Sequence, residues 1–262
     1  QTVVTNASGE VRFDVTNTTA GITTVQASIN GTDVSKGVTF IAGKPVASLS
    51  VLSTDSGSYT AGGEIIVSAV LKDAQGNAVS GVTDLLNDSY AVLNVQGAER
   101  KTGSVWAESS TKGTYLVIYT AVTAGTGLKA TVKLADWADV VESAAYAIEA
   151  DASSAMISAS VLDNGKKLTP ADGITTYDVK ILVNDKYGNI VKLYSVTLTS
   201  PVLTNPKTVS TSDDGSVTTS ISSAIAGSND VTITSSTNSS VDEVRVTLKY
   251  SIISINVSNP LP

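Results

Sequence analysis

The chain has 262 residues, with 17 basic against 24 acidic side chains, a formal charge of -7 and a pI near 4.6. A surface of this charge repels phosphate groups, so neither nucleic acid nor an anionic membrane is expected as a partner. The absence of cysteine and histidine excludes disulfides, thiolate chemistry, the usual general base and the usual transition-metal ligand. We therefore expect no enzyme activity, no catalytic, cofactor-binding or metal-binding residues, and no cofactor. Paired carboxylates for glycoside cleavage are the enzymatic alternative that the composition leaves open.

The N-terminal segment, residues 1–43, contains a stretch in which Val11, Phe13 and Val15 alternate with polar residues. This alternation is typical of half-buried antiparallel strands. The segment has room for about three strands and no opposing sheet, which is too little for an independent core. We expect it to be the C-terminal part of a domain that is completed outside this sequence or docked on its neighbour.

The next segment, residues 44–150, contains the turn KDAQGNAV at positions 72–79 between apolar stretches. Asp73 fits the first position of a type I turn, where its carboxylate accepts hydrogen bonds from backbone N–H groups two and three residues on. Gly76 fits the fourth position, which needs the positive φ that glycine adopts without strain.

The last segment, residues 151–262, repeats this turn as NDKYGNIV at positions 184–191. The preceding strand places Tyr177, Val179, Ile181 and Val183 on one face, with mostly polar residues opposite. We expect the turn to recur because each domain has the same internal corner.

Longer stretches recur at an interval slightly above about 100 residues, the size of an immunoglobulin-like sandwich. They are GEVRFDVTNTTAG from Gly9, GTYLVIYTAVTAG from Gly113 and GSVTTSISSAIAG from Gly215, each ending in Ala-Gly. A stretch that would form the first strand of a unit also recurs, at 46–53 and 156–163. The fold predicted is all-β, with tandem Ig-like β-sandwiches arranged as an elongated rod. The expected domains are 1–43, 44–150 and 151–262, with the first strand of a following repeat at 252–258.

Direct membrane insertion of this segment is not expected, because no apolar stretch approaches about 18 residues. No signal peptide is evident at the start. A signal for export would lie outside this sequence.

The two tryptophans are the main candidates for a contact with a partner, because large aromatic rings are enriched at binding hot spots. A position in the core or at a joint between repeats is the simpler explanation for both Trp106 and Trp137. Trp137 is singled out as a possible partner-binding residue because Asp136 and Asp139 flank it. A further hypothesis is calcium held at a joint by Asp213 with Asp214, by Asp136 with Asp139, or by Asp172, and solvated turn acids are the simpler explanation.

The stretch ADGITTYDVKILVNDKYGNIV, residues 171–191, resembles the bacterial Ig-like (Big-1) repeats of the intimin and invasin family of inverse autotransporter adhesins. The Gly-to-Ala-Gly block at 215–227 and GVTF at 37–40 resemble later strands of the same repeats. The middle copy departs from the pattern, with Ala-Gly-Gly at 61–63 in place of Ala-Asp-Gly.

This resemblance implies an extracellular segment on a bacterial cell surface, anchored in the outer membrane through a part of the parent protein not present here. The Ig-like domains would form a stalk that contributes to host-cell or cell–cell adhesion. The partners implied are a host-cell surface receptor or neighbouring bacterial cells, together with flanking Ig-like repeats. The alternative is that the Ig-like domains themselves bind a host protein or glycan. A third possibility, an accessory module of a carbohydrate-active enzyme, would need a strip of exposed aromatic rings.

Overall fold

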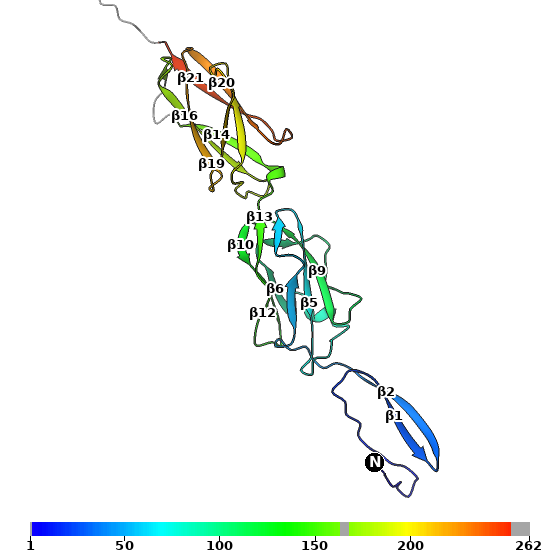
Figure 1. Cartoon of the computed structure of the whole chain (residues 1–262). Helices are drawn as coiled ribbons and strands as arrows, with labels where there is room; N and C mark the ends of the chain where they lie inside the picture. Colours follow the sequence, from blue (N-terminus) through cyan, green and yellow to red (C-terminus); the bar gives the residue numbers. More distant parts are fainter. Residues whose placement is uncertain (1, 163–167, 253–262) are drawn as a thin grey trace, which may run out of the picture.

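The computed structural model describes residues 2–162 and 168–252, and its regular structure there consists of strands and two short 3-10 helices. Figure 1 shows an N-terminal hairpin followed by two strand-rich bodies in chain order. No helix among the described residues has the length and apolar character needed to cross a membrane. The predominance of strands confirms the prediction of an all-β fold.

The N-terminal part contains two strands, β1 (Gly21–Ile29) and β2 (Thr32–Phe40), paired antiparallel around a turn at Asn30 and Gly31. Both turn residues have positive φ, as the favoured two-residue hairpin turn requires. The expectation of about three strands is wrong, because residues 10–17 form no strand. The equivalent stretches of the later units each pair with a neighbouring strand, and the described residues offer no such neighbour to 10–17.

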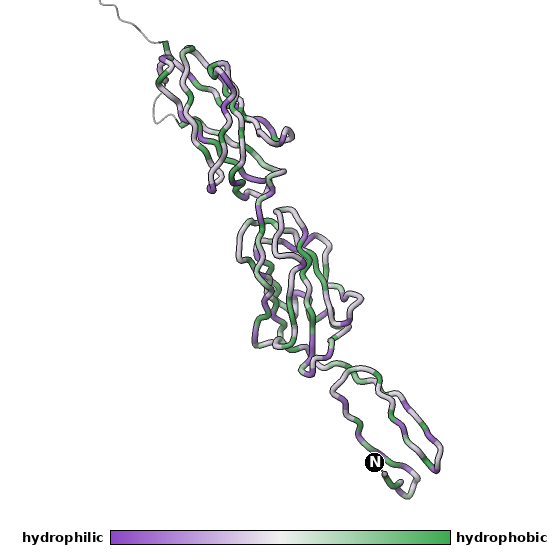
Figure 2. The backbone as a smooth tube through the Cα atoms, viewed as in Figure 1, coloured by the Kyte–Doolittle hydropathy of each residue, from purple (hydrophilic) through white to green (hydrophobic). Residues whose placement is uncertain are grey.

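Figure 2 shows hydrophilic and hydrophobic residues interleaved along the strands, as expected of sheets with one buried face. In the N-terminal part this pattern lacks a partner layer, and Phe13 is 53% exposed while Ile22 is 77% exposed. In the two later bodies the apolar side chains of facing sheets meet.

The middle unit packs one sheet containing β3, β5, β9 and β7, with β8 added on β9, against strands β6, β11 and β12. The strands β10, β13 and β4 form a third small sheet, in which β13 and β4 run parallel. The strand bounds are β3 Val51–Thr54, β4 Ser58–Thr60, β5 Glu64–Val70, β6 Ala91–Val95, β7 Ala98–Arg100, β8 Ala107–Glu108, β9 Thr114–Ala121, β10 Gly125–Leu128, β11 Ala130–Leu134, β12 Val141–Glu142 and β13 Tyr146–Glu149, with a 3-10 turn at Thr83–Leu86.

The last unit packs the sheet β14-β16-β19 against the sheet β15-β21-β20-β17-β18. The strand bounds are β14 Met156–Leu162, β15 Thr169–Pro170, β16 Thr176–Asn184, β17 Ser195–Thr199, β18 Lys207–Ser210, β19 Ser216–Ser222, β20 Gly227–Ser235 and β21 Val244–Ser251, after a 3-10 turn at Ala152–Ser154.

Each unit has its own hydrophobic core. The buried apolar residues form two clusters, one between positions 52 and 148 and the other between 155 and 250. In β16 the predicted inward face is confirmed, since Tyr177, Val179, Ile181 and Val183 are all buried. Tyr177 and Tyr250 meet edge to face with ring centroids 5.2 Å apart, which adds a geometry-specific contact to a core without disulfides.

The expected domain limits near 43/44 and 150/151 stay predictions. The strand expected at 252–258 lies, apart from Ile252, outside the described residues.

Candidate functional site

Trp137 and its acidic neighbours lie at the end of β11 in the middle unit. The Trp137 side chain is buried in the core cluster, and its indole N–H donates a hydrogen bond of 2.9 Å to the Pro45 carbonyl. Asp136 accepts a hydrogen bond of 2.9 Å from Lys44, which raises the pKa of that lysine. Asp139 is exposed. The ring thus ties the end of the unit to the linker that enters it.

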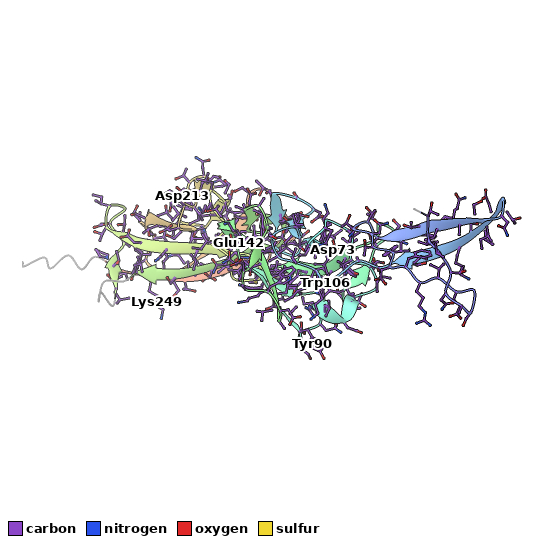
Figure 3. All side chains as sticks on the ribbon, turned by 90° about the horizontal axis from the view of Figure 1, so that it is seen from below. Asp73, Tyr90, Trp106, Glu142, Asp213 and Lys249 are labelled. Atoms are coloured by element: carbon purple, nitrogen blue, oxygen red, sulfur yellow. The ribbon has the colours of Figure 1, made fainter. Side chains whose placement is uncertain are left out.

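A hollow of about 220 Å³ adjoins this region, between the linker and the loop before β6. Tyr90 lines it and is 56% exposed, and Figure 3 labels it at the periphery of the unit. Trp137 and Asp136 also line the hollow, whereas Asp139 does not. Trp106 is buried in the same core. Contact of a partner with Trp137, Asp136 or Asp139 stays a prediction.

The other acidic candidates cap turns in the last unit. Asp172 accepts hydrogen bonds from the backbone of Ile174 and Thr175, and Asp214 accepts from Ser212 and Ser216. The hydrogen bond from the Thr175 hydroxyl, together with those from the backbone, lowers the pKa of Asp172, and the hydrogen bonds from Ser212 and Ser216 lower that of Asp214. Within 2–162 and 168–252, no three acidic side chains come together as a set of metal ligands.

The repeated turn forms a second and more elaborate site. In the last unit, Asp185 Oδ1 accepts hydrogen bonds from the N–H groups of Tyr187 (2.9 Å) and Asn189 (2.8 Å), and Gly188 has φ +85°. The middle unit has the same arrangement around Asp73. The predicted turn is confirmed in outline, but the second donor lies four residues on rather than three.

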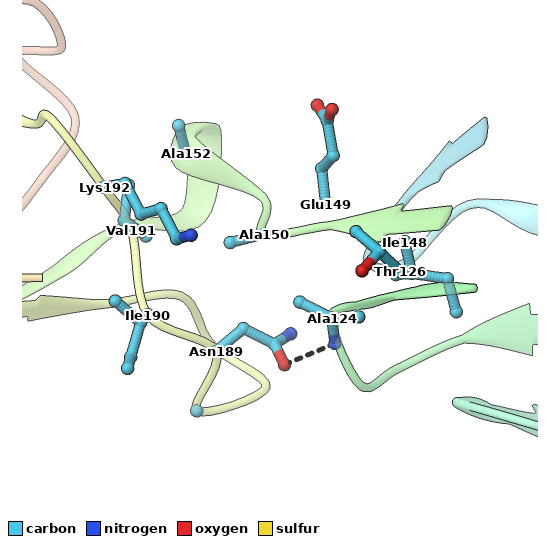
Figure 4. Close-up of a pocket in the computed structure, with 12 residues that line it drawn as sticks. Ala124, Thr126, Ile148, Glu149, Ala150, Ala152, Asn189, Ile190, Val191 and Lys192 are labelled. Carbon is cyan, nitrogen blue, oxygen red and sulfur yellow. Dashed lines mark hydrogen bonds between the residues drawn. The ribbon is translucent and has the colours of Figure 1, made fainter. Parts of the chain in front are cut away.

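The asparagine at the end of this turn contacts the preceding unit. The Asn189 carboxamide donates to the Val122 carbonyl at 2.7 Å and accepts from the Ala124 N–H at 2.8 Å. Figure 4 shows the Asn189 side chain pointing across the gap toward Ala124. A carboxamide carries the donor and the acceptor of a peptide group, so it pairs with the backbone as an adjacent strand would. We call this contact, with residues 122–124 and 185–189, the second joint.

The same contact occurs between the N-terminal part and the middle unit. Asn77 Nδ2 donates to the Thr18 carbonyl at 2.9 Å, and the Ala20 N–H donates to Asn77 Oδ1 at 2.9 Å. We call this contact, with residues 18–20 and 73–77, the first joint. Figure 3 labels Asp73 at the end of the middle unit near the hairpin.

The aspartate of each turn binds the linker that connects the two units. The Gly43 N–H donates to Asp73 Oδ2 at 2.9 Å, and the Asp151 N–H donates to Asp185 Oδ2 at 3.0 Å. In both turns the asparagine amide also donates to this oxygen at 2.9 Å. One carboxylate thus holds the turn, the linker and the docking asparagine together.

The charge of these aspartates is maintained by the hydrogen bonds. The amide of Asn77, with the backbone N–H groups around it, lowers the pKa of Asp73 to about 2. Burial opposes ionisation of Asp185, but the hydrogen bonds from Asn189, Asp151 and Tyr187 outweigh it, and the pKa is lowered.

The second joint also has an apolar contact and a cavity. Tyr187 packs against the core cluster of the middle unit, and a Cβ added to Gly62 would lie 2.7 Å from its hydroxyl. A cavity of about 750 Å³ lies beside this joint, with Ile148, Ala150 and Lys192 among its lining residues.

The joint adds to the sequence-based explanation of the repeated turn. The turn that forms the same corner in each sandwich also forms the contact with the preceding unit. The roles of Asn77 and Asn189 were missed. One signal in the sequence could have indicated these roles. The Ala-Gly pair recurs along with the turn, and Ala20 and Ala124, the alanines of two of these pairs, are the residues that the two asparagines contact.

Comparisons with known proteins agree with this architecture. The family described as bacterial Ig-like domain (group 1) matches residues 159–249. The chain is 26% identical over 227 residues to the inverse autotransporter adhesin YeeJ of Escherichia coli (strain K12), covering 84% of this chain and 9% of that relative. This chain therefore spans about a tenth of the length of that relative.

Two solved structures share the fold. One is FdeC, an Escherichia coli adhesin, with a TM-score of 0.52 and 23% identity over 88% of this chain and 74% of that chain. The other is invasin, described as a bacterial integrin-binding protein, with the same TM-score and identity over 95% of this chain and 49% of that chain. Residues 159–249 thus match the bacterial Ig-like domain of group 1, and over most of its length the chain is similar to an inverse autotransporter adhesin.

Proposed function

We propose that this chain is a non-catalytic extracellular segment of a bacterial surface adhesin, in which Ig-like domains form a stalk. The stalk holds a binding element away from the cell and so contributes to adhesion to host cells or to neighbouring bacteria. The parent protein is anchored in the outer membrane through a part outside this sequence.

The repeated joint is the observation that supports this proposal. A stalk needs neighbouring domains whose orientation is restricted, and domains on short linkers with specific contacts meet that need. Here each joint fixes the linker through an aspartate and the preceding unit through an asparagine. The kinship with YeeJ, an adhesin, supports the same role. Invasin, which shares the fold, is an integrin-binding protein, and we propose a host-cell surface receptor as one class of partner for the parent protein.

The stalk geometry is tested by small-angle X-ray scattering of the 262-residue chain. An extended arrangement predicts a maximum dimension of about 90 to 110 Å, from strands of about seven residues plus loops in each unit. A compact particle would contradict the proposal.

The spacer role is tested with beads coated with the purified chain. A spacer should bind host cells no better than albumin-coated beads, whereas beads carrying the full-length parent adhesin should adhere.

The second candidate function is direct binding by the Ig-like domains, for which the hollow beside Tyr90, Asp136 and Trp137 is the specific observation. If beads carrying the chain alone adhere, and Tyr90→Ala together with Asp136→Ala abolishes adherence, direct binding replaces the spacer role. Thr111→Ala on an exposed loop of the same unit is the matched control.

A further inference from the structure

The last unit carries, at its far end, a copy of the surface on which Asn189 docks. Strands β10 and β13 pair Gly125 with Ile148, and strands β20 and β21 pair Gly227 with Tyr250. The two glycines therefore begin equivalent strands, in equivalent places beside the last strand of each unit.

Residues three and one before each glycine supply the docking groups. In the middle unit these are Val122 and Ala124, which bond to Asn189. In the last unit they are Ala224 and Ala226, and both are exposed. No described residue forms a hydrogen bond with the Ala224 carbonyl or the Ala226 N–H.

Hydrogen bonds within the last unit already fix the conformation of the segment that carries these two groups. The buried Ser223 hydroxyl accepts from the Ile225 N–H and donates to the Ile225 carbonyl, each at 2.8 Å. The Asn229 amide donates to the carbonyls of Ile225 and Gly227. A surface fixed before binding loses little conformational entropy when it binds, which favours docking.

The contact for the tyrosine is also present and uncovered. Gly62 donates to the Ala121 carbonyl with φ +90°, and Gly173 donates to the Ser223 carbonyl with φ +74°. Tyr187 covers Gly62, whereas a Cβ added to Gly173 would meet only a methyl group at 3.9 Å. Gly173 is exposed. The place that a tyrosine ring fills in the second joint is thus open here.

We propose that Gly173, Ala224 and Ala226 form a docking socket for an Asp-x-Tyr-Gly-Asn turn on a further Ig-like domain. The asparagine carboxamide of that turn pairs with the Ala224 carbonyl and the Ala226 N–H, and its tyrosine covers Gly173. Such a head-to-tail contact joins each unit to the next without closing into a ring.

The chemistry of the socket selects its occupant. A carbonyl and an N–H two residues apart match one carboxamide, whereas a carboxylate in its place would face the carbonyl oxygen with a negative charge. The proposal concerns how the units join, and it is independent of the adhesive role.

The test uses a chain in which residues 1–252 are followed directly by a second copy of residues 151–252. Amide hydrogen exchange measured by NMR then compares the Ala226 N–H in this chain and in the 262-residue chain. We expect exchange at Ala226 to slow at least about tenfold, because the N–H gains a partner. The Ala124 N–H, already bonded, should exchange slowly in both and serves as the internal reference.

Two variants of the second copy make the test specific. Asn189→Ala there should return Ala226 to fast exchange, and the matched change Asn205→Ala, on an exposed loop, should leave it protected. Equal Ala226 exchange in both chains, with a folded second copy and a protected Ala124, would overturn the proposal.

A further measurement needs only the 262-residue chain. Asn189→Ala should speed exchange of the Ala124 N–H at least about tenfold, with Asn205→Ala as the control. Unchanged protection at Ala124 would show that the carboxamide is not what joins the units, and the socket would be rejected even if the appended copy failed to fold.

Discussion

The first and second joints share their polar contacts and differ in their apolar contact. In both, an asparagine carboxamide bonds to the backbone of the preceding unit, and an aspartate bonds to the linker. The residue two positions after the aspartate is Gln75 in the first joint, where it is exposed, and Tyr187 in the second, where it packs on the neighbouring core.

This difference indicates that the polar and the apolar contacts have different roles in the joint. The hydrogen bonds are short and directional, so they set how one unit is placed on the next. The aromatic contact adds buried apolar surface without changing that placement. We therefore expect the second joint to be the stiffer of the two.

The largest effect is expected from Asp185→Ala, which leaves the N–H groups of Asp151, Tyr187 and Asn189 without their acceptor. Losing a charged acceptor shared by several partly buried donors should lower the free energy of unfolding of the last unit by about 3 kcal/mol. Urea unfolding followed by NMR signals of each unit measures this loss. Asp213→Ala, at an exposed turn of the same unit, should change little. Equal effects of the two changes would mean that the turn carboxylate is not structurally special.

A smaller effect is expected from Gly62→Ala, compared with Gly173→Ala. Both glycines have positive φ, so each change should cost about 1 kcal/mol of backbone strain. Only the Gly62 change places a methyl group against the Tyr187 hydroxyl, so only it should speed exchange of the Ala124 N–H. If both variants, or neither, alter Ala124 exchange, the aromatic contact does not contribute to the joint.

The change Tyr187→Gln should make the second joint resemble the first. We expect a loss of about 1 kcal/mol in coupling, because a half-buried ring leaves the neighbouring core. The readout is ¹⁵N relaxation, in which the middle and last units of the original chain should tumble together and those of the variant more independently. Asn205→Ala, on an exposed loop of the same unit, is the control. Unchanged tumbling would mean that the hydrogen bonds alone set the stiffness.

The smallest difference between the joints is expected on acidification. Asp73 and Asp185 both have a lowered pKa in the folded chain, against 3.8 as the ordinary value. Their stabilisation is therefore fully present above about pH 4 and is lost as the pH falls through the folded pKa, which is about 2 for Asp73. Relaxation measurements should show both joints unchanged from pH 8 to 5 and loosened only as the pH falls below about 4, with the first joint lost near pH 2. Loosening near pH 6 would point to other groups.

Much of the fold could be predicted from local patterns. The inward face of β16 and the positive φ of Gly76 and Gly188 followed from alternation and turn chemistry, because both depend on residues close in the chain. The number of strands before residue 43 could not be predicted in the same way. Alternation around Phe13 shows only that the segment suits a strand, and a strand forms only beside a partner.

The sequence by itself determined that the chain is built from strands, that a unit recurs and that each copy carries the same turn, since these depend on residue spacing along the chain. Tertiary structure alone decided what the turn does. Asn189 and Ala124 are far apart in sequence, and nothing in either residue type indicates the other as its partner. Only the placing of one unit's end on the next brings the carboxamide within hydrogen-bonding distance of the backbone, and a hydrogen bond depends on that distance.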